Sequence, residues 1–207
     1  QVRAGYLKLG QIALAPSPEE ADVILVNTCA FIDAAREEAA DAILNACEHK
    51  QAGGCRAVVV TGCMVQRYRE RLKKAFPEVD AFLGVDELEQ IGEVVRRVAE
   101  GKRCGVVANQ GVPVKVYNPT YPSLLFTGGP FAYLKIADGC NHRCAYCAIP
   151  NIRGHFRSRS VDDLVSESAG MISAGVKEVN LISQDTLLYG IDKQGSPSIA
   201  ELMRRID

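Results

Sequence analysis

The sequence predicts an α/β protein in two parts, a doubly wound parallel-sheet domain followed by the beginning of a second α/β domain. Over residues 21–100, short continuous apolar runs alternate with segments of helical periodicity, which is typical of βαβ units. Residues 105–130 then hold four of the nine prolines and no Asp or Glu, and the βα alternation starts again after them. We therefore predict domains at 1–104 and 131–207, joined by a linker at 105–130.

The first domain is predicted to contain three strands and three helices. Residues 23–26 and 58–60 are continuous apolar runs, as expected for strands that helices cover on both faces, and residues 81–83 form a shorter third strand. Helices are predicted between the first two strands, over 64–75, and after the third strand. The apolar faces of the first and third helices are Ile32, Ala35, Ala39, Ile43 and Cys47, and Leu88, Ile91, Val94, Val95 and Val98.

The second domain begins with a predicted strand at 132–137 that runs directly into a cysteine-rich loop. A helix over 161–174, a strand over 178–182 and a helix from Ser198 complete the predicted elements. Glu167 lies in the middle of the first of these helices, where the sequence indicates no partner for it.

Composition excludes several classes of protein. The net charge of −1 argues against binding of nucleic acid through the overall charge of the protein. No apolar run approaches the roughly 20 residues that span a bilayer, so we expect no membrane partner. Eight cysteines without a secretion signal indicate metal ligands and core thiols in a reducing cytoplasm. The chain begins with Gln1 rather than Met, so we expect the intact protein to be longer.

The most specific motif is the cysteine loop, in which Cys140, Cys144 and Cys147 can converge on one metal centre. Three thiolates on a [4Fe–4S] cluster leave one iron open to a small molecule, whereas electron-transfer clusters commonly use four cysteines. The alternative is a structural zinc site with His142 or His155 as the fourth ligand.

Polar residues near this loop are candidate ligand-binding groups. Residues 141–160 contain four arginines and no acid, and the guanidinium groups of Arg153 and Arg159 could pair with a carboxylate. Gln184 and Asp185 follow the strand at 178–182, where catalytic groups of barrel folds lie. The alternatives are a solvated basic loop and, for Asp185, a cap on the next segment.

Two more cysteines occupy equivalent positions in the first domain. Cys29 and Cys63 each come just after the carboxyl end of a predicted parallel strand, where ligands of open α/β sheets collect. Alternatively, each is a small buried apolar residue. Cys47, Cys55 and Cys104 are interpreted as structural.

The spacing of Cys140, Cys144 and Cys147, with the aromatic Tyr146 before the third cysteine, resembles the radical S-adenosylmethionine (SAM) enzymes. The resemblance implies that these thiols hold a [4Fe–4S] cluster whose open iron binds SAM, with the backbone around Tyr146 against the adenine. It also implies that the second domain is the beginning of a partial (β/α)6 barrel.

Residues 21–33 and 60–64 are similar to the amino-terminal domain of the radical SAM methylthiotransferases. That domain holds a second, auxiliary [4Fe–4S] cluster with three cysteines. Cys29 and Cys63 match two of them, and we expect the remaining one to precede Gln1. Residues 132–140, 147–150 and 180–186 resemble the branch that modifies a ribosomal protein; tRNA-modifying members typically carry Gln-Asn where this chain has Gln184 and Asp185.

The resemblance implies transfer of a methylthio group to the β-carbon of an aspartate in a small-subunit ribosomal protein. One SAM would methylate a sulfur atom on the auxiliary cluster, and a second would supply the radical that abstracts hydrogen from the aspartate. A flavodoxin or ferredoxin is the expected electron donor, and no DNA partner is expected. We expect the 207-residue chain alone to be inactive. A tRNA adenosine as target and a non-catalytic zinc-binding module remain the alternatives.

Overall fold

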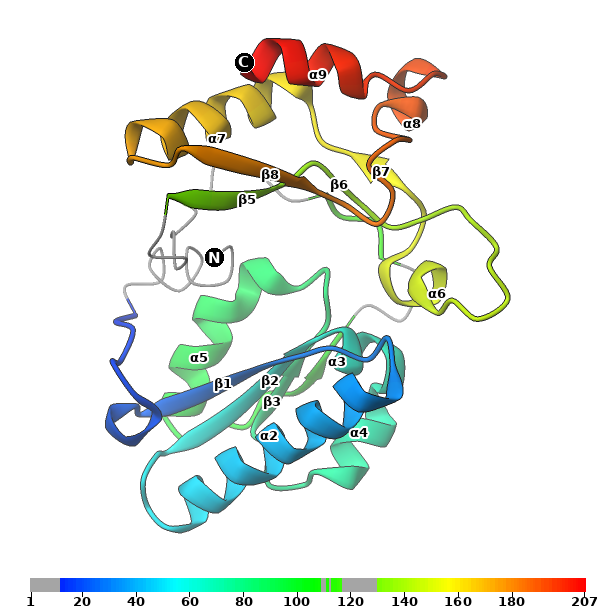
Figure 1. Cartoon of the computed structure of the whole chain (residues 1–207). Helices are drawn as coiled ribbons and strands as arrows, with labels where there is room; N and C mark the ends of the chain where they lie inside the picture. The colour runs from blue at the N-terminus through cyan, green and yellow to red at the C-terminus, as the bar shows by residue number, and fades with distance from the viewer. Residues whose placement is uncertain (1–11, 109–110, 112, 117–129) are drawn as a thin grey trace. The chain divides into compact units, whose positions relative to one another are not determined.

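The computed structural model describes residues 12–108, 111, 113–116 and 130–207 (Figure 1). The chain divides into two compact units, residues 2–113 and residues 114–207. Most of the predicted linker lies outside the described residues.

The first unit is built on a parallel sheet of strand order β1-β2-β3-β4. The strands β1 (Val23–Thr28), β2 (Ala57–Gly62) and β3 (Ala81–Leu83) confirm the three predicted strands. The fourth strand, β4 (Gly105–Val107), pairs with β3 and occupies the first residues of the predicted linker. The sheet therefore extends beyond the predicted end of the domain.

Helices cover both faces of this sheet, as the doubly wound fold requires (Figure 1). One face carries α2 (Asp33–Gln51), α3 (Cys63–Tyr68) and α4 (Glu70–Ala75), whose apolar residues pack on Val58, Val60 and Phe82. The other carries α5 (Ile91–Ala99), which the short 3-10 helix η2 (Leu88–Gln90) precedes. A further 3-10 helix, η1 (Pro18–Glu20), precedes β1.

Two predictions in this unit are wrong in detail. Ile32 does not belong to the core face of α2, because the helix begins at Asp33 and the Ile32 side chain is 55% exposed. The single helix predicted over 64–75 is divided into α3 and α4 at Arg69, whose φ of 47° is incompatible with a continuous right-handed helix.

The second unit contains the start of a parallel βα fold. β5 (Phe131–Lys135) pairs in parallel with β8 (Glu178–Ile182), and α7 (Val161–Ser173) connects them. Side chains of α7 and α9 (Ile199–Ile206) pack with Ala132 and Leu134 into one core. The predicted helices and the strand at 178–182 are thus confirmed.

The predicted strand at 132–137 is interrupted before the cysteine loop. Its last part is β6 (Ala137–Asp138), which leaves β5 and pairs antiparallel with β7 (Arg157–Ser158). Two short helices were not predicted, α6 (Ile149–Arg153) and α8 (Ile191–Gln194). The hairpin of β6 and β7 closes the base of the loop that carries the three cysteines.

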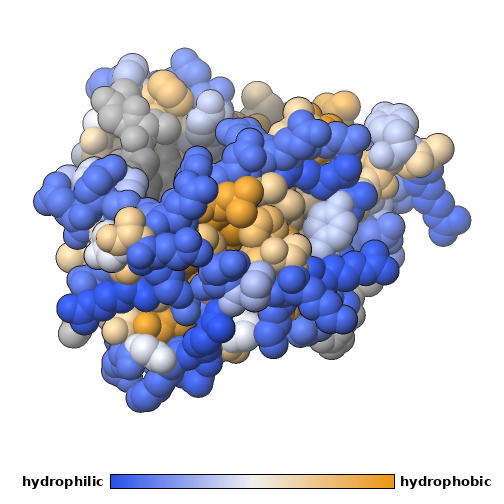
Figure 2. Space-filling view, turned by 90° about the horizontal axis from the view of Figure 1, so that it is seen from below, coloured by the Kyte–Doolittle hydropathy of each residue, from blue (hydrophilic) through white to orange (hydrophobic). Residues whose placement is uncertain are grey.

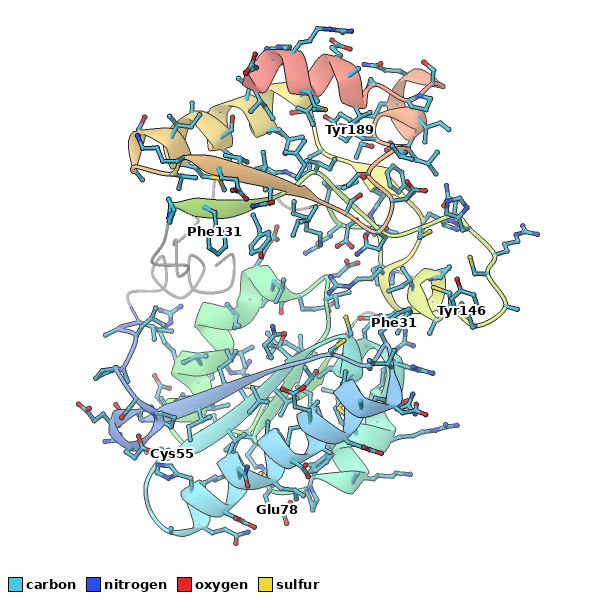
Figure 3. The ribbon with its side chains drawn as sticks, in the orientation of Figure 1. Phe31, Cys55, Glu78, Phe131, Tyr146 and Tyr189 are labelled. Carbon is cyan, nitrogen blue, oxygen red and sulfur yellow. The ribbon has the colours of Figure 1, made fainter. Side chains whose placement is uncertain are left out.

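A buried polar cluster joins the residue after β7, the end of β5, α7 and the turn before α8 in the second unit. Nη2 of Arg159 lies 2.6 Å from Oε2 of Glu167, and Nη1 donates to the carbonyl of Lys135 at 3.0 Å. The hydroxyl of Tyr189, a buried residue labelled in Figure 3, donates to the carbonyl of Arg159 at 2.9 Å. Glu167 therefore has a partner that the sequence did not indicate.

The face seen from below the view of Figure 1 is mainly hydrophilic, with a hydrophobic area near its centre (Figure 2). Within the described residues, no helix combines the length and the apolar character that a membrane crossing requires.

Candidate functional site

The three cysteines of the loop lie between β6 and α6 and differ in accessibility. Cys140 is buried, Cys147 is half-buried and Cys144 is exposed; all three thiols are free. Tyr146 projects from the loop and is 87% exposed (Figure 3). The thiols of Cys144 and Cys147 and the aromatic ring are thus open to a ligand that approaches from solvent.

The amino-terminal side of the loop is attached to the segment that follows α6. The backbone N–H of Cys140 donates to the carbonyl of Gly154 at 3.0 Å, and Oδ1 of Asn141 accepts from the N–H of Phe156 at 3.0 Å. Gly139 has φ +79°, and a Cβ there would lie 2.1 Å from the carbonyl oxygen of His155. A glycine at position 139 is therefore required for this close approach.

Asp138 at the end of β6 is surrounded by basic groups. Its Oδ2 lies 2.6 Å from Nζ of Lys135 and 3.4 Å from Nη1 of Arg153, and its Oδ1 accepts from the N–H of Gly139 at 2.9 Å. Burial alone would raise the pKa of Asp138, but Lys135 and Arg153 outweigh burial and hold the pKa below its ordinary value. The predicted ligand-binding residue Arg153 thus has a carboxylate partner in the protein.

Asp185 follows β8 and forms hydrogen bonds with both carboxylate oxygens. Oδ2 lies 2.7 Å from Nε2 of His142 in the cysteine loop, and Oδ1 accepts from the N–H of Leu187 at 3.0 Å. The hydrogen bond with His142 lowers the pKa of Asp185. Asp185 therefore caps the segment after β8, the alternative that the sequence left open, and also contacts the loop. Gln184 beside it is exposed.

In the first unit, Cys29 follows β1 directly and Cys63 follows β2 directly. These strands are neighbours in register, with Thr28 beside Gly62, and the hydroxyl of Thr28 donates to the carbonyl of Thr61 at 2.7 Å. Gly62, at φ +106°, lets the chain pass the Thr28 carbonyl closely. Cys29 is exposed and Cys63 is half-buried, so neither is a fully buried core residue.

The donor chemistry of the cysteine loop fits an iron–sulfur cluster, since three free thiols lie within eight residues. In the described part of the chain, no three His, Cys, Asp or Glu side chains converge as the ligands of a single metal ion do. A cavity of about 730 Å³ lies at the amino end of β1, opposite the Cys29 end of that strand, and contains none of the predicted site residues.

Two residues with specific contacts at the loop were not among the predicted site residues, Asp138 and Asn141. Asp138 directly precedes the Gly-Cys pair; Lys135 is a local partner three residues before it, whereas Arg153 reaches it from α6 only in the folded chain. Asn141 follows Cys140, and its contact with Phe156 depends on the unpredicted β6–β7 hairpin. His142, considered only as a zinc ligand, contacts Asp185 instead.

Comparisons with known proteins cover both units. Residues 1–84 match the family described as Uncharacterized protein family UPF0004, and residues 134–206 match the Radical SAM superfamily. Over 98% of its length, the chain shares a fold with the radical SAM methyltransferase TsrM from Kitasatospora setae, with a TM-score of 0.53 over 42% of that protein and 14% identity. Residues 134–206 of the second unit thus match the Radical SAM superfamily, and the likeness to TsrM shows the fold.

Relatives at higher identity extend over the whole chain. The uS12 methylthiotransferase RimO of Syntrophus aciditrophicus is 43% identical over 100% of this chain and 46% of its own length. The RimO protein of Symbiobacterium thermophilum is 46% identical over 91% of this chain and 38% of its own length. That of Heliobacterium modesticaldum is 43% identical over 100% of this chain and 44% of its own length. The chain belongs to the radical SAM methylthiotransferase family, and it spans less than half the length of these relatives.

Proposed function

We propose that the intact protein is a cytoplasmic radical SAM methylthiotransferase that adds a methylthio group to the β-carbon of an aspartate in ribosomal protein uS12. The observation that carries this proposal is the similarity of the chain, from end to end, to proteins named uS12 methylthiotransferase. The exposed cysteine loop supports it, because radical SAM chemistry needs three thiolates and an open coordination position.

Cys140, Cys144 and Cys147 are the proposed ligands of the first [4Fe–4S] cluster. When bound, this cluster and SAM supply a radical that abstracts hydrogen from an unreactive carbon. Tyr146, Arg153 and Gln184 are proposed to line the SAM site around the loop, with Asp185 beside Gln184 and bonded to His142. Tyr146 is exposed at the loop, and the Arg153 guanidinium can contact a carboxylate while Asp138 orients it.

Arg159 is proposed to act on the same site without contacting SAM. Its guanidinium contacts Glu167 and the Lys135 carbonyl rather than the loop surface. With its side chain 2% exposed, Arg159 reaches SAM only if this pair opens. We therefore propose that Arg159 supports the SAM site by fixing the ends of β5 and β7.

Cys29 and Cys63 are proposed to hold the auxiliary cluster together with a cysteine outside this chain. Their positions after neighbouring parallel strands bring two thiols to one edge of the sheet. The proposed domains are the methylthiotransferase amino-terminal domain, predicted as 1–104 and extended by β4, and the radical SAM domain, 131–207. A reduced flavodoxin or ferredoxin is the proposed electron donor.

The experiment that tests this function compares two substrates. The intact protein, reconstituted anaerobically with iron and sulfide, is given SAM, a reductant, and either uS12 or unmodified tRNA. Mass spectrometry should show one methylthio group replacing hydrogen on a uS12 aspartate and no change in the tRNA. Methylthiolation of tRNA adenosine alone would assign the protein to the other branch of the family.

A further inference from the structure

The two sides of the cysteine loop are attached to the domain in different ways. The amino-terminal side is fixed by the β6–β7 hairpin, by the bond from Cys140 to Gly154, and by the bond between Asn141 and Phe156. The other side, residues 142–147, carries Cys144 and Cys147 and is mostly exposed. It includes an internal turn in which the Cys147 N–H donates to the Cys144 carbonyl at 3.0 Å.

A single contact ties residues 142–147 to a distant element. Among the residues that the structure describes, the bond between Nε2 of His142 and Oδ2 of Asp185 is the one hydrogen bond that joins this segment to a part of the chain other than the loop and α6. A carboxylate only accepts hydrogen bonds, so Nε2 of His142 carries the proton. The contact spans 43 residues of sequence.

Asp185 is well placed to act as the fixed end of this contact. It comes just after β8, which pairs along its full length with β5. Its second oxygen accepts from the Leu187 N–H at 3.0 Å, which fixes the orientation of the carboxylate. The Asp185 side chain is 22% exposed, whereas that of His142 is 54% exposed. Asp185 is therefore the more firmly held of the two residues, and the contact restrains the loop segment that carries His142.

We propose that Asp185 is a positioning residue that holds, through His142, the loop segment that carries Cys144. The contact thereby limits the positions that the Cys144 thiol can adopt relative to the thiols of Cys140 and Cys147. This role rests on the proposed function, because it matters only if the three thiols share a cluster. It differs from direct SAM binding, which the sequence predicted for Asp185. Without the His142 contact, the Cys144 segment has more conformations to lose when a cluster binds, so the cluster is held less tightly.

The test uses the intact, anaerobically reconstituted protein and four variants of it: His142→Ala, Asp185→Ala, the double variant with both alanines, and His142→Gln. The first readout is the rate at which an iron chelator removes iron from the oxidised protein. Outer-sphere partners of metal sites commonly change affinity 10- to 100-fold, so we expect roughly 10-fold faster loss in each single Ala variant. The double variant should lose iron no faster than either single variant, because both remove the same contact.

Two controls separate the contact from general damage to the loop. The Gln amide of His142→Gln can still donate to Asp185 and should restore slow iron loss. Arg143→Ala changes an exposed neighbour in the same segment and should behave as the unsubstituted protein. The second readout is the electron paramagnetic resonance spectrum of the reduced cluster with and without SAM, which should shift on addition of SAM in every variant that retains iron.

Several results would overturn the proposal. The proposal would be wrong if both single Ala variants lost iron at the rate of the unsubstituted protein. It would also be wrong if the double variant lost iron faster than either single variant by the product of their separate effects. A raised KM for SAM in Asp185→Ala, with unchanged iron loss, would make Asp185 a SAM ligand instead. Failure of the unsubstituted protein to hold iron, or its purification with stoichiometric zinc, would reject the proposed function and this role together.

Discussion

At the scale of single residues, the charged groups around the cysteine loop are paired with groups from other elements. Asp138 meets Lys135 and Arg153, and Arg159 meets Glu167. The sequence indicated the basic character of this region, because residues 141–160 contain no acid. It did not indicate the pairs of Asp138 with Arg153 and of Glu167 with Arg159, because both acids lie outside that stretch and meet these arginines only in the folded chain.

The pair of Arg159 and Glu167 yields a stability prediction. Glu167→Ala should destabilise the protein by about 3 kcal/mol, because it removes the carboxylate that pairs with the buried guanidinium of Arg159. Asp162→Ala is the matched control, since Asp162 lies on the same helix and pairs with Arg205 at the surface, where removal costs less than about 1 kcal/mol. Urea denaturation of the intact apoprotein measures both changes; equal losses would contradict the assignment of Arg159–Glu167 as a buried structural pair.

Tyr189 yields a prediction about pH. Burial raises the pKa of its phenol to about 12, against about 10 in an unfolded chain. The neutral phenol is therefore favoured by folding, and its contribution is complete below pH 10 and is lost as the pH rises toward 12. Tyr189→Phe should lose about 1 kcal/mol at neutral pH and should show a shallower fall in stability between pH 10 and 12. Parallel pH profiles for the two proteins would contradict this.

At the scale of elements, the predictions succeeded where an apolar pattern was long or continuous. The runs at 58–60 and 81–83 lie in the centre of a covered sheet, and both are strands. The shorter elements β6, β7, α6 and α8 are too short to show an apolar periodicity in the sequence. Tertiary hydrogen bonds hold them instead, such as the bond from the Ser158 N–H to the Asp192 carboxylate. The break at Arg69 was missed because nothing in the residue type signals a positive φ.

The junction of α3 and α4 can be tested with two substitutions at one position. Arg69→Gly and Arg69→Ala both remove the side-chain bonds to the carbonyls of Gln66 and Gly111. Only glycine adopts φ near 47° with ψ near −119° without strain, so the Gly variant should be more stable by about 1 kcal/mol. Thermal denaturation gives the order of stability. The opposite order, typical of helix interiors, would mean that the helix is continuous through residue 69.

Gly139 lies between β6 of the hairpin and Cys140 of the proposed cluster site. Gly139→Ala would place a Cβ 2.1 Å from the His155 carbonyl oxygen, so β6 and Cys140 must shift. We expect lower iron content after anaerobic reconstitution of the intact protein. Gly170→Ala in α7 is the matched control, because the space around it is open and helix propensity favours alanine by about 1 kcal/mol. Full iron content in Gly139→Ala would show that the loop tolerates a displaced hairpin.

At the scale of the whole molecule, each unit carries thiols just after strands of its sheets. Cys29 and Cys63 follow β1 and β2, and the cysteine loop follows β5 and β6. The sequence predicted these positions because each cysteine adjoins a recognisable strand. It could not predict how the loop is held, because the contact between His142 and Asp185 depends on β5 and β8 becoming neighbours.

The central claim is that Cys140, Cys144 and Cys147 hold a cluster that cleaves SAM, and formation of 5′-deoxyadenosine tests it most directly. The intact protein with SAM and dithionite should form this product, and so should Cys104→Ala, which alters a cysteine outside the loop. Cys144→Ala should form none. Product formation by Cys144→Ala at the unsubstituted rate, or a colourless zinc-containing protein that forms no product, would contradict the account.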